Sequence, residues 1–340
     1  MKKLTFALLF VLTIAGVSAA SAVDYFHTDW ETARKAARKQ DKPLYVHFTT
    51  DWCTWCRKIE DDVYRDKEGK AALKPFVPVS LDCTQRGKSG KELKQARENI
   101  ELMKQWGGGG YPFLVQVTAD GTVFNSWSGY QPLPQFKQEL KGALGALKDF
   151  RAFEEKAKSA DRDSYEFNLQ AMKVYSGVQK HGQALKAAKR VLQLDPDNKQ
   201  GNAARAAMTR FESLQALGKQ SQLQDALKQV QKYDPENKKG LWEKSASAYA
   251  LTTLRNARST SPDQRKKSFK RSIDVLQDLT EQDFELNQPQ RNHYFLGILY
   301  AQAGQQNEAV KTLQEAVAID PDSREAKFIK ETISRLKKNR

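Results

Sequence analysis

The chain has 340 residues, of which 39% are hydrophobic and 29% are charged, and its formal net charge is +15 at pH 7. At about 150 residues per domain, this length predicts two domains. Beyond the N-terminal segment, no stretch approaches the roughly 20 apolar residues that a membrane-spanning helix needs, and a chain with only 3 cysteines does not have a disulfide-stapled framework.

The N-terminal segment, residues 1–22, indicates a signal peptide. Two lysines precede an almost wholly apolar run over residues 4–17, and Ala20-Ser21-Ala22 has the small-x-small pattern of a cleavage site. We expect the mature chain to begin near Val23 and to be periplasmic or secreted, in a compartment where disulfides persist. An uncleaved anchor is the alternative for the same segment.

Residues 23–150 follow the pattern of an α/β domain. Asp29–Lys39 is predicted as a helix with Asp29 as its N-cap, and Pro43–Thr50 as a strand buried on both faces. The further predicted elements are a helix over 53–64, a strand over 76–82, a helix over 89–106, strands over 113–118 and 122–127 joined by a turn at Ala119-Asp120-Gly121, and a helix over 134–150. This order predicts a βαβ unit joined to a ββα unit.

The motif Trp52-Cys53-Thr54-Trp55-Cys56 lies at a predicted strand-to-helix turn. Two thiols at this spacing can close into a disulfide with little backbone movement. Cys53 would face the positive end of the helix dipole, which favours the thiolate over the thiol. Because a thiolate attacks disulfides and a second thiol resolves the mixed disulfide, the pair predicts thiol–disulfide exchange without a further cofactor.

This element order, with the Cys pair after the first core strand and Tyr111-Pro112 before the hairpin, resembles the thioredoxin family. The phrase from Thr50 to Lys58 is most similar to secreted or periplasmic members with a Trp-Cys-x-x-Cys motif. The resemblance implies that Cys53 is the attacking thiolate, Cys56 the resolving thiol and Pro112 a cis-proline beside the pair. It also assigns substrate contact to Trp52, Trp55 and Tyr111.

The sequence departs from the thioredoxin pattern at three places. His47 stands six residues before Cys53, where thioredoxin has an acid; a neutral imidazole could accept the proton of the second thiol, or His47 could be an ordinary core residue. Thr54-Trp55 replaces the usual dipeptide between the two cysteines, so the sequence does not determine the redox potential of the pair. Cys83 is an extra cysteine at the end of a predicted strand, either a third redox thiol or a half-buried bystander. The Cys pair with His47 provides too few ligands for zinc, and we expect no metal.

From Arg151 onward the chain shows helical repeats. The segment Arg291–Pro321 resembles the tetratricopeptide repeat, with Leu296-Gly297, Tyr300, Ala309 and Ala316 at the expected offsets, and two weaker matches end at Asp195-Pro196 and Asp234-Pro235. We also predict a longer helix pair over 242–258 and 262–283 and a capping helix over 324–337. Such pairs stack into a solenoid with a concave face for protein partners.

The C-terminal half also holds most of the positive charge, with 34 Lys and Arg against 24 Asp and Glu over residues 151–340. The run Arg265-Lys266-Lys267 with Lys270 and Arg271 lies on a predicted helix. It indicates a solvated helix face, with acidic protein or anionic lipid as the alternative contact. A nucleic-acid partner is not expected in the predicted compartment.

The sequence therefore predicts three segments: a signal peptide over 1–22, a thioredoxin-like domain over 23–150 and a repeat domain over 151–340. We predict an extracytoplasmic thiol–disulfide oxidoreductase whose repeats recruit a protein client or assembly partner, with a membrane or soluble thiol reductase or oxidase as its redox partner. The alternatives are a non-catalytic adaptor built on the same folds and, as a lesser one, a metallochaperone.

Overall fold

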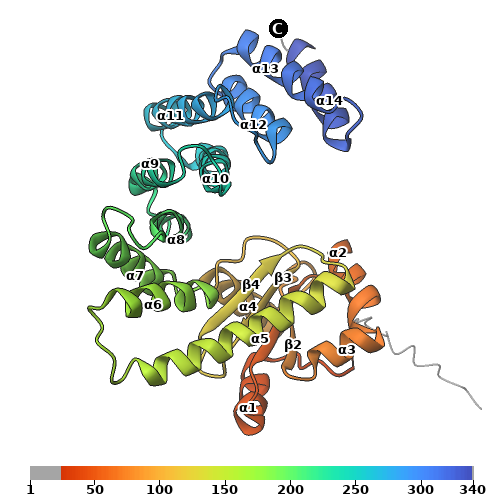
Figure 1. Cartoon of the computed structure of the whole chain (residues 1–340). Helices are drawn as coiled ribbons and strands as arrows, with labels where there is room; N and C mark the ends of the chain where they lie inside the picture. The colour runs from red at the N-terminus through yellow and green to blue at the C-terminus, as the bar shows by residue number, and fades with distance from the viewer. Residues whose placement is uncertain (1–23, 339–340) are drawn as a thin grey trace, which may run out of the picture. The chain divides into compact units, whose positions relative to one another are not determined.

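The computed structural model describes residues 24–338 (Figure 1). The predicted signal peptide and the mature start near Val23 lie outside the described residues. The chain folds into two compact units that divide between Leu144 and Gly145, within one long helix.

The first unit is an α/β structure whose elements follow the predicted order. Its strands are β1 (Leu44–Thr49), β2 (Val77–Asp82), β3 (Phe113–Val117) and β4 (Val123–Ser128). Its helices are α1 (Trp30–Gln40), α2 (Thr54–Ile59), the π-helical turn η1 (Glu60–Tyr64), α3 (Lys67–Leu73), α4 (Gly90–Gln105) and the start of α5 (Leu133–Lys156). The predicted N-cap of α1 is confirmed, because the Asp29 carboxylate accepts the N–H of Thr32 at 2.7 Å.

The four strands form one sheet in the order β2-β1-β3-β4. The pair β1–β2 is parallel, with Thr49 opposite Asp82, so both strands end at the same edge. The pairs β1–β3 and β3–β4 are antiparallel. This is the predicted βαβ unit joined to a ββα unit, and its shared strand end carries the segment that precedes Cys53.

Each face of the sheet is covered by helices, which is why β1 is buried on both sides. One face packs Val46, Phe48 and their neighbours against α1 and α4. The other face presents Tyr45 and His47 toward Tyr64 of η1, and Tyr45 also contacts Phe136 at the start of α5. Figure 1 shows α5 running across this sheet. Because both faces of β1 are buried, its sequence is mainly apolar, with His47 as the one basic side chain.

The helix predicted over 53–64 differs from the observed structure. The α-helical geometry ends at Ile59, and residues 60–64 form a π-helical turn in which the Arg65 N–H bonds the Glu60 carbonyl at 3.0 Å. Single π turns of this kind are frequent beside functional sites. A further helix, α3, begins at Lys67 with Asp66 as its N-cap, whose carboxylate accepts the N–H groups of Glu68 and Gly69. This helix was not predicted from the sequence.

The second unit is wholly helical in its described residues. After the end of α5 come α6 (Tyr165–Gly177), α7 (His181–Leu194), α8 (Ala203–Ala216), α9 (Leu223–Tyr233), α10 (Leu241–Asn256), α11 (Pro262–Thr280), α12 (Pro289–Gln302), α13 (Gln306–Ile319) and α14 (Arg324–Lys338), with short 3₁₀ turns η2 (Gln220–Gln222) and η3 (Ala257–Ser259). The predicted longer pair corresponds to α10 and α11, and the predicted capping helix to α14.

A repeated turn joins successive helix pairs of this unit. Asp195 and Asp234 each end a helix as buried side chains. The Asp195 carboxylate accepts two backbone N–H groups of the following loop, and that of Asp234 accepts one from the loop and one from Leu241 at the start of α10. Three residues later, Asn198 and Asn237 adopt positive φ and accept an N–H from the next helix. The Asp-Pro pairs recognised in the sequence therefore mark turns in which side chains replace missing backbone partners.

Small residues allow the helices of this unit to approach closely. A Cβ on Gly297 would lie 2.6 Å from the Leu313 side chain, so glycine is required where α12 crosses α13. Its largest core cluster includes Phe211, Leu227 and Leu276, and smaller clusters form around Met172 and around Leu313. Among residues 24–338, no helix is both long and apolar enough to cross a membrane.

Candidate functional site

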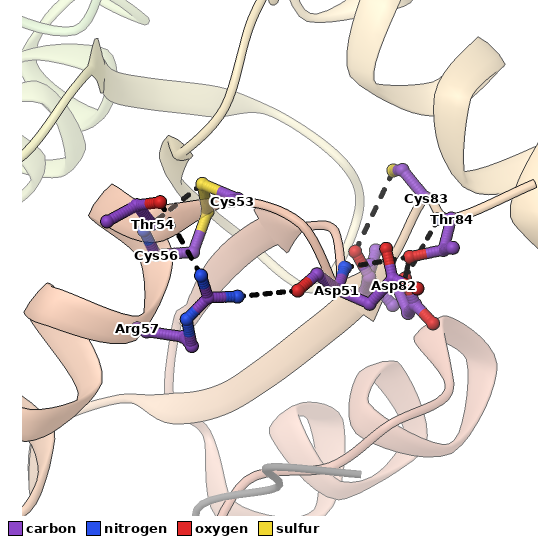
Figure 2. Close-up of a disulfide and its surroundings, with 9 residues drawn as sticks. Asp51, Cys53, Thr54, Cys56, Arg57, Asp82, Cys83 and Thr84 are labelled. Atoms are coloured by element: carbon purple, nitrogen blue, oxygen red, sulfur yellow. Dashed lines mark hydrogen bonds between the residues drawn. A yellow bond between two sulfur atoms is a disulfide. The ribbon is translucent and has the colours of Figure 1, made fainter. Parts of the chain in front are cut away.

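Cys53 and Cys56 form a disulfide at the start of α2, with 5.2 Å between their Cα atoms (Figure 2). Cys53 is the N-cap residue, and its sulfur accepts the backbone N–H of Cys56 at 3.1 Å. Both residues are buried, with exposed fractions of 4% and 1%. A sulfur placed against a helix N-terminus receives that N–H and the positive end of the helix dipole, which stabilise negative charge on it when the disulfide is open.

The segment before Cys53 is tied to both sides of the site. The Arg57 guanidinium donates to the Asp51 carbonyl at 2.6 Å, which folds the helix back on this segment (Figure 2). The Asp51 N–H donates to the Thr84 hydroxyl at 2.9 Å, and that hydroxyl donates to the Asp82 carboxylate at 2.6 Å. The end of β2 therefore holds the loop that presents Cys53.

The peptide bond between Tyr111 and Pro112 is cis, as the sequence analysis predicted. Pro112 is buried and directly precedes β3, and its carbonyl accepts the N–H of Gly129 at 2.9 Å. Gly129 has a φ of 91°, in the left-handed region that favours glycine. This bond joins the loop before β3 to the loop after β4.

Two aromatic pairs flank the disulfide segment. The ring of Trp52 meets the ring of Tyr111 edge-on with 5.7 Å between centroids, and the ring of Trp55 lies 5.8 Å from that of Tyr130. Both tryptophans are more than half exposed, at 63% and 56%. Large exposed aromatic rings in the same segment as a reactive group favour contact with an apolar partner.

Tyr130 is a candidate site residue that the sequence analysis missed. Its hydroxyl donates to the Asp62 carboxylate at 2.6 Å, and the Lys58 ammonium lies 5.2 Å above its ring. Lys58 also pairs with Asp62 at 2.6 Å, and these bonds from Lys58 and Tyr130 lower the pKa of Asp62. Lys58 and Asp62 show the i, i+4 pattern in the sequence, but Tyr130 is 68 residues from Asp62, so only the fold brings it there.

His47 lies fully buried in the middle of β1, and its ring packs against Tyr64 with 5.5 Å between centroids. Within the described chain, neither ring nitrogen has a hydrogen-bond partner. Burial lowers the pKa of His47 to about 3. The ring is therefore neutral at physiological pH. Because its pKa lies far below that of a thiol, it is a weak proton acceptor, which fits the core-residue alternative better than the proton-acceptor role.

Cys83 is a free and buried thiol that follows β2 directly. Figure 2 shows Cys83 apart from the disulfide, next to Thr84. Burial raises the pKa of Cys83 to about 12, although a hydrogen bond with the Tyr111 hydroxyl acts in the opposite direction. A thiol in this state is a poor nucleophile. Its sulfur donates to the Leu81 carbonyl at 3.7 Å, and it also bonds the hydroxyl of Tyr111, whose ring packs against Trp52.

No group of three or more His, Cys, Asp or Glu side chains is arranged to hold a metal ion in the part of the chain between residues 24 and 338. The site thus consists of two sulfurs, a neutral imidazole and an aromatic surround. The two sulfurs can supply a nucleophile and a resolving thiol, which thiol–disulfide exchange needs.

Comparison with known proteins agrees with both folds. Residues 30–144 match the profile of a thioredoxin-like domain, and residues 290–323 match that of a tetratricopeptide repeat. The chain is 35% identical over 108 residues to the disulfide bond reductase DsbH of Chlamydia pneumoniae, covering 30% of this chain and 63% of that protein. It is 33% identical over 66 residues to the thiol:disulfide interchange protein DsbD of Vibrio vulnificus strain CMCP6, covering 19% of this chain and 11% of DsbD.

A solved structure of a DsbH oxidoreductase is also similar, with 25% identity and a TM-score of 0.31 over 36% of this chain and 90% of that one. The match to each curated relative spans less than two thirds of that relative's length. The first unit of the chain is a thioredoxin-like domain carrying a Cys-x-x-Cys disulfide. The chain as a whole joins this domain to a tetratricopeptide-like helical array.

Proposed function

We propose that this protein is an extracytoplasmic thiol–disulfide oxidoreductase that acts on protein disulfides through Cys53 and Cys56. The observation that carries the proposal is the disulfide at the N-terminus of α2, in a segment that also carries the exposed rings of Trp52 and Trp55. The names of the relatives, a disulfide bond reductase and a thiol:disulfide interchange protein, support the same chemistry.

The proposed reaction runs in two exchanges. With the pair reduced, the Cys53 thiolate attacks one sulfur of a substrate disulfide, and the substrate's other sulfur leaves as a thiolate that takes a proton. Cys56 then loses its proton to an acceptor and attacks the Cys53 sulfur, which releases the second substrate thiol. The substrate disulfide gains two electrons and two protons, and Cys53 and Cys56 become the disulfide.

His47, six residues before Cys53, is the candidate acceptor: its ring nitrogens have no hydrogen-bond partner, and its low pKa means that it would hold the proton only transiently. Trp52 and Tyr111 form one wall for the substrate chain and Trp55 with Tyr130 the other. The backbone of Tyr111 and Pro112 would pair with an extended substrate segment. A thiol reductase or oxidase, membrane-bound or soluble, would reset the pair after each turnover, and the helical array would recruit the protein client.

The test compares disulfide reduction by the wild-type chain with that by Cys53→Ser, using a protein disulfide as substrate and a thiol reductant in excess. Cys83→Ala is the matched control, since it removes a buried thiol outside the pair. We expect Cys53→Ser to lose turnover and Cys83→Ala to retain it. Equal rates for wild type and Cys53→Ser would leave the domain as a docking module and reject the enzymatic proposal.

The client and the compartment need separate measurements. Cys56→Ser lacks the resolving thiol and should accumulate a mixed disulfide through Cys53, which identifies the captured protein. Capture of small thiols alone would argue against client recruitment. N-terminal sequencing of the exported protein should find Val23 first; retention of residues 1–22 in a cytoplasmic fraction would contradict the proposed location.

A further inference from the structure

The proposed redox function leaves the basic segment over residues 255–271 unused. This segment holds seven Lys and Arg and one Asp, a net charge of +6 in 17 residues. It runs from the end of α10 through η3 into the first half of α11. Positive charge at this density repels itself and lowers the stability of the folded state unless counter-charges neutralise it.

Three of these cations line one open cavity of about 690 Å³. The cavity lies between the connection that precedes α9, the end of α10 and the start of α11, and Arg265, Lys267 and Arg271 face it. Most of the other residues that line it are polar or aromatic, Tyr249, Ser221 and Ser268 among them, and no Asp or Glu contributes to the wall. The cations therefore converge on a space that contains no protein counter-charge.

The hydrogen bonds of these side chains are incomplete. One terminal nitrogen of Arg265 donates to the Thr260 carbonyl at 3.1 Å, which fixes the guanidinium, while its Nε–H is buried and has no partner. Neither Lys267 nor Arg271 forms an ion pair with any carboxylate between residues 24 and 338, in contrast to Lys270, which pairs with Asp274 on the same helix. A buried donor without an acceptor is costly, and an anion in the cavity would supply the acceptor.

We propose that this cavity binds the phosphate group of an anionic ligand. A guanidinium presents planar N–H groups that match phosphate oxygens, and two arginines with a lysine would neutralise its charge. The volume exceeds that of one phosphate and leaves room for an attached organic group. A phosphorylated small molecule and an anionic phospholipid headgroup share this chemistry. The site lies in the repeat unit and does not depend on the disulfide.

The first experiment measures binding of inorganic phosphate and glycerol phosphate to the full chain by calorimetry, at constant ionic strength set with chloride. Arg265→Gln with Arg271→Gln should weaken saturable phosphate binding by about tenfold or more, since each removes a charge-assisted hydrogen bond. Lys270→Gln is the matched control on the same helix and should change affinity less than about twofold. Equal weakening by the control, or no preference for phosphate over chloride, would reduce the site to diffuse surface charge and overturn the proposal.

A second variant tests the same site without removing a cation. Ser268→Glu places a carboxylate among the three cations, so it should raise the unfolding temperature in the absence of phosphate and abolish the phosphate response. An unchanged phosphate response would contradict the proposed location. Sedimentation with phosphatidylglycerol vesicles, against phosphatidylcholine, separates the sources: binding that the double variant loses indicates a lipid headgroup, and phosphate binding without vesicle binding indicates a soluble ligand.

Discussion

The hydroxyl of Tyr130 donates a hydrogen bond to the carboxylate of Asp62 across 2.6 Å, and so joins the loop after β4 to the helical segment that follows the disulfide. The same carboxylate pairs with Lys58, whose ammonium lies over the Tyr130 ring. This arrangement fixes the ring beside Trp55, where a substrate chain would pass. It makes the aromatic pair Trp55–Tyr130 a property of two segments distant in sequence.

We expect Tyr130→Ala to raise KM for a protein disulfide by about two- to tenfold, the range that the loss of one aromatic contact provides. The rate with a small aromatic-free disulfide should not change, because such a substrate does not reach the wall. Tyr130→Phe keeps the ring and is the matched control. Steady-state kinetics with both substrates check this, and an equal loss with the small disulfide would show that Tyr130 acts on the sulfurs instead.

The buried thiol of Cys83 should resist alkylation in the folded protein. Burial raises its pKa to about 12, so almost none of it is thiolate at pH 7, whereas the reduced Cys53 has the helix N-terminus to stabilise its charge. After reduction, iodoacetamide should modify Cys53 first and Cys83 only when denaturant is added. Peptide mass spectrometry reads out the order, and rapid labelling of Cys83 without denaturant would be the contrary result.

Alkaline pH should destabilise the first unit, and ionisation of the Cys83 thiol should be one cause. The folded protein holds the Cys83 proton more tightly than the unfolded chain, whose thiol has a pKa of about 8.5. The stability that this contributes is complete below pH 8.5 and is lost as pH rises toward 12. Cys83→Ala should therefore show a flatter decline of unfolding free energy over that window in denaturant titrations, and an identical slope would contradict the assignment.

His47 should make the first unit sensitive to acid. Its pKa is lowered to about 3 by burial, against about 6.5 in an unfolded chain, so the unfolded state binds the proton first as pH falls. Stability is complete above pH 6.5 and declines between pH 6.5 and 3. His47→Leu should flatten this decline and stabilise the unit by about 1 to 2 kcal/mol at neutral pH, since it removes two unpartnered buried nitrogens.

The same variant separates structure from function at this position. If His47 accepts the Cys56 proton, His47→Leu should slow disulfide reduction by about tenfold or more while the protein becomes more stable. Stopped-flow kinetics of the resolving step at pH 6 to 8 measure this effect. A variant that is more stable and fully active would show that His47 is only a core residue.

Glu243 should be a stability determinant of the repeat unit. Its buried carboxylate accepts the backbone N–H groups of Asn287 and Gln288 and the side-chain amides of Asn287 and Asn292, at 2.6 to 2.9 Å. Burial alone would raise the pKa of Glu243, but these bonds outweigh it and lower the pKa. Stability from this group is present above pH 4.5 and lost as pH falls below it.

We expect Glu243→Gln to destabilise the repeat unit by about 2 kcal/mol, because an amide cannot accept all of these bonds. Glu236→Gln is the control, since Glu236 forms only an exposed pair with Lys238. Thermal unfolding monitored by far-ultraviolet circular dichroism compares the two. Equal melting temperatures would show that other contacts hold α10 to α12.

Local sequence patterns determined the elements, because each pattern has a local physical cause. The Asp29 cap, the apolar run of β1 and the Asp-Pro turns of the repeats depend on neighbours within a few residues, and all are present in the structure. The π turn after Ile59 has no such signal, since it arises where η1 packs Tyr64 against Tyr45 and Phe136.

The Cys-x-x-Cys pair and Tyr111-Pro112 were recognisable in the sequence because their chemistry depends on residue type and on a separation of a few positions. Their surroundings were not. Tertiary structure alone places Tyr130 on Asp62, leaves the His47 nitrogens unpartnered and encloses Cys83 away from the disulfide. These features depend on which distant segments lie in contact and on how far water is excluded from them. Both are determined by the tertiary structure.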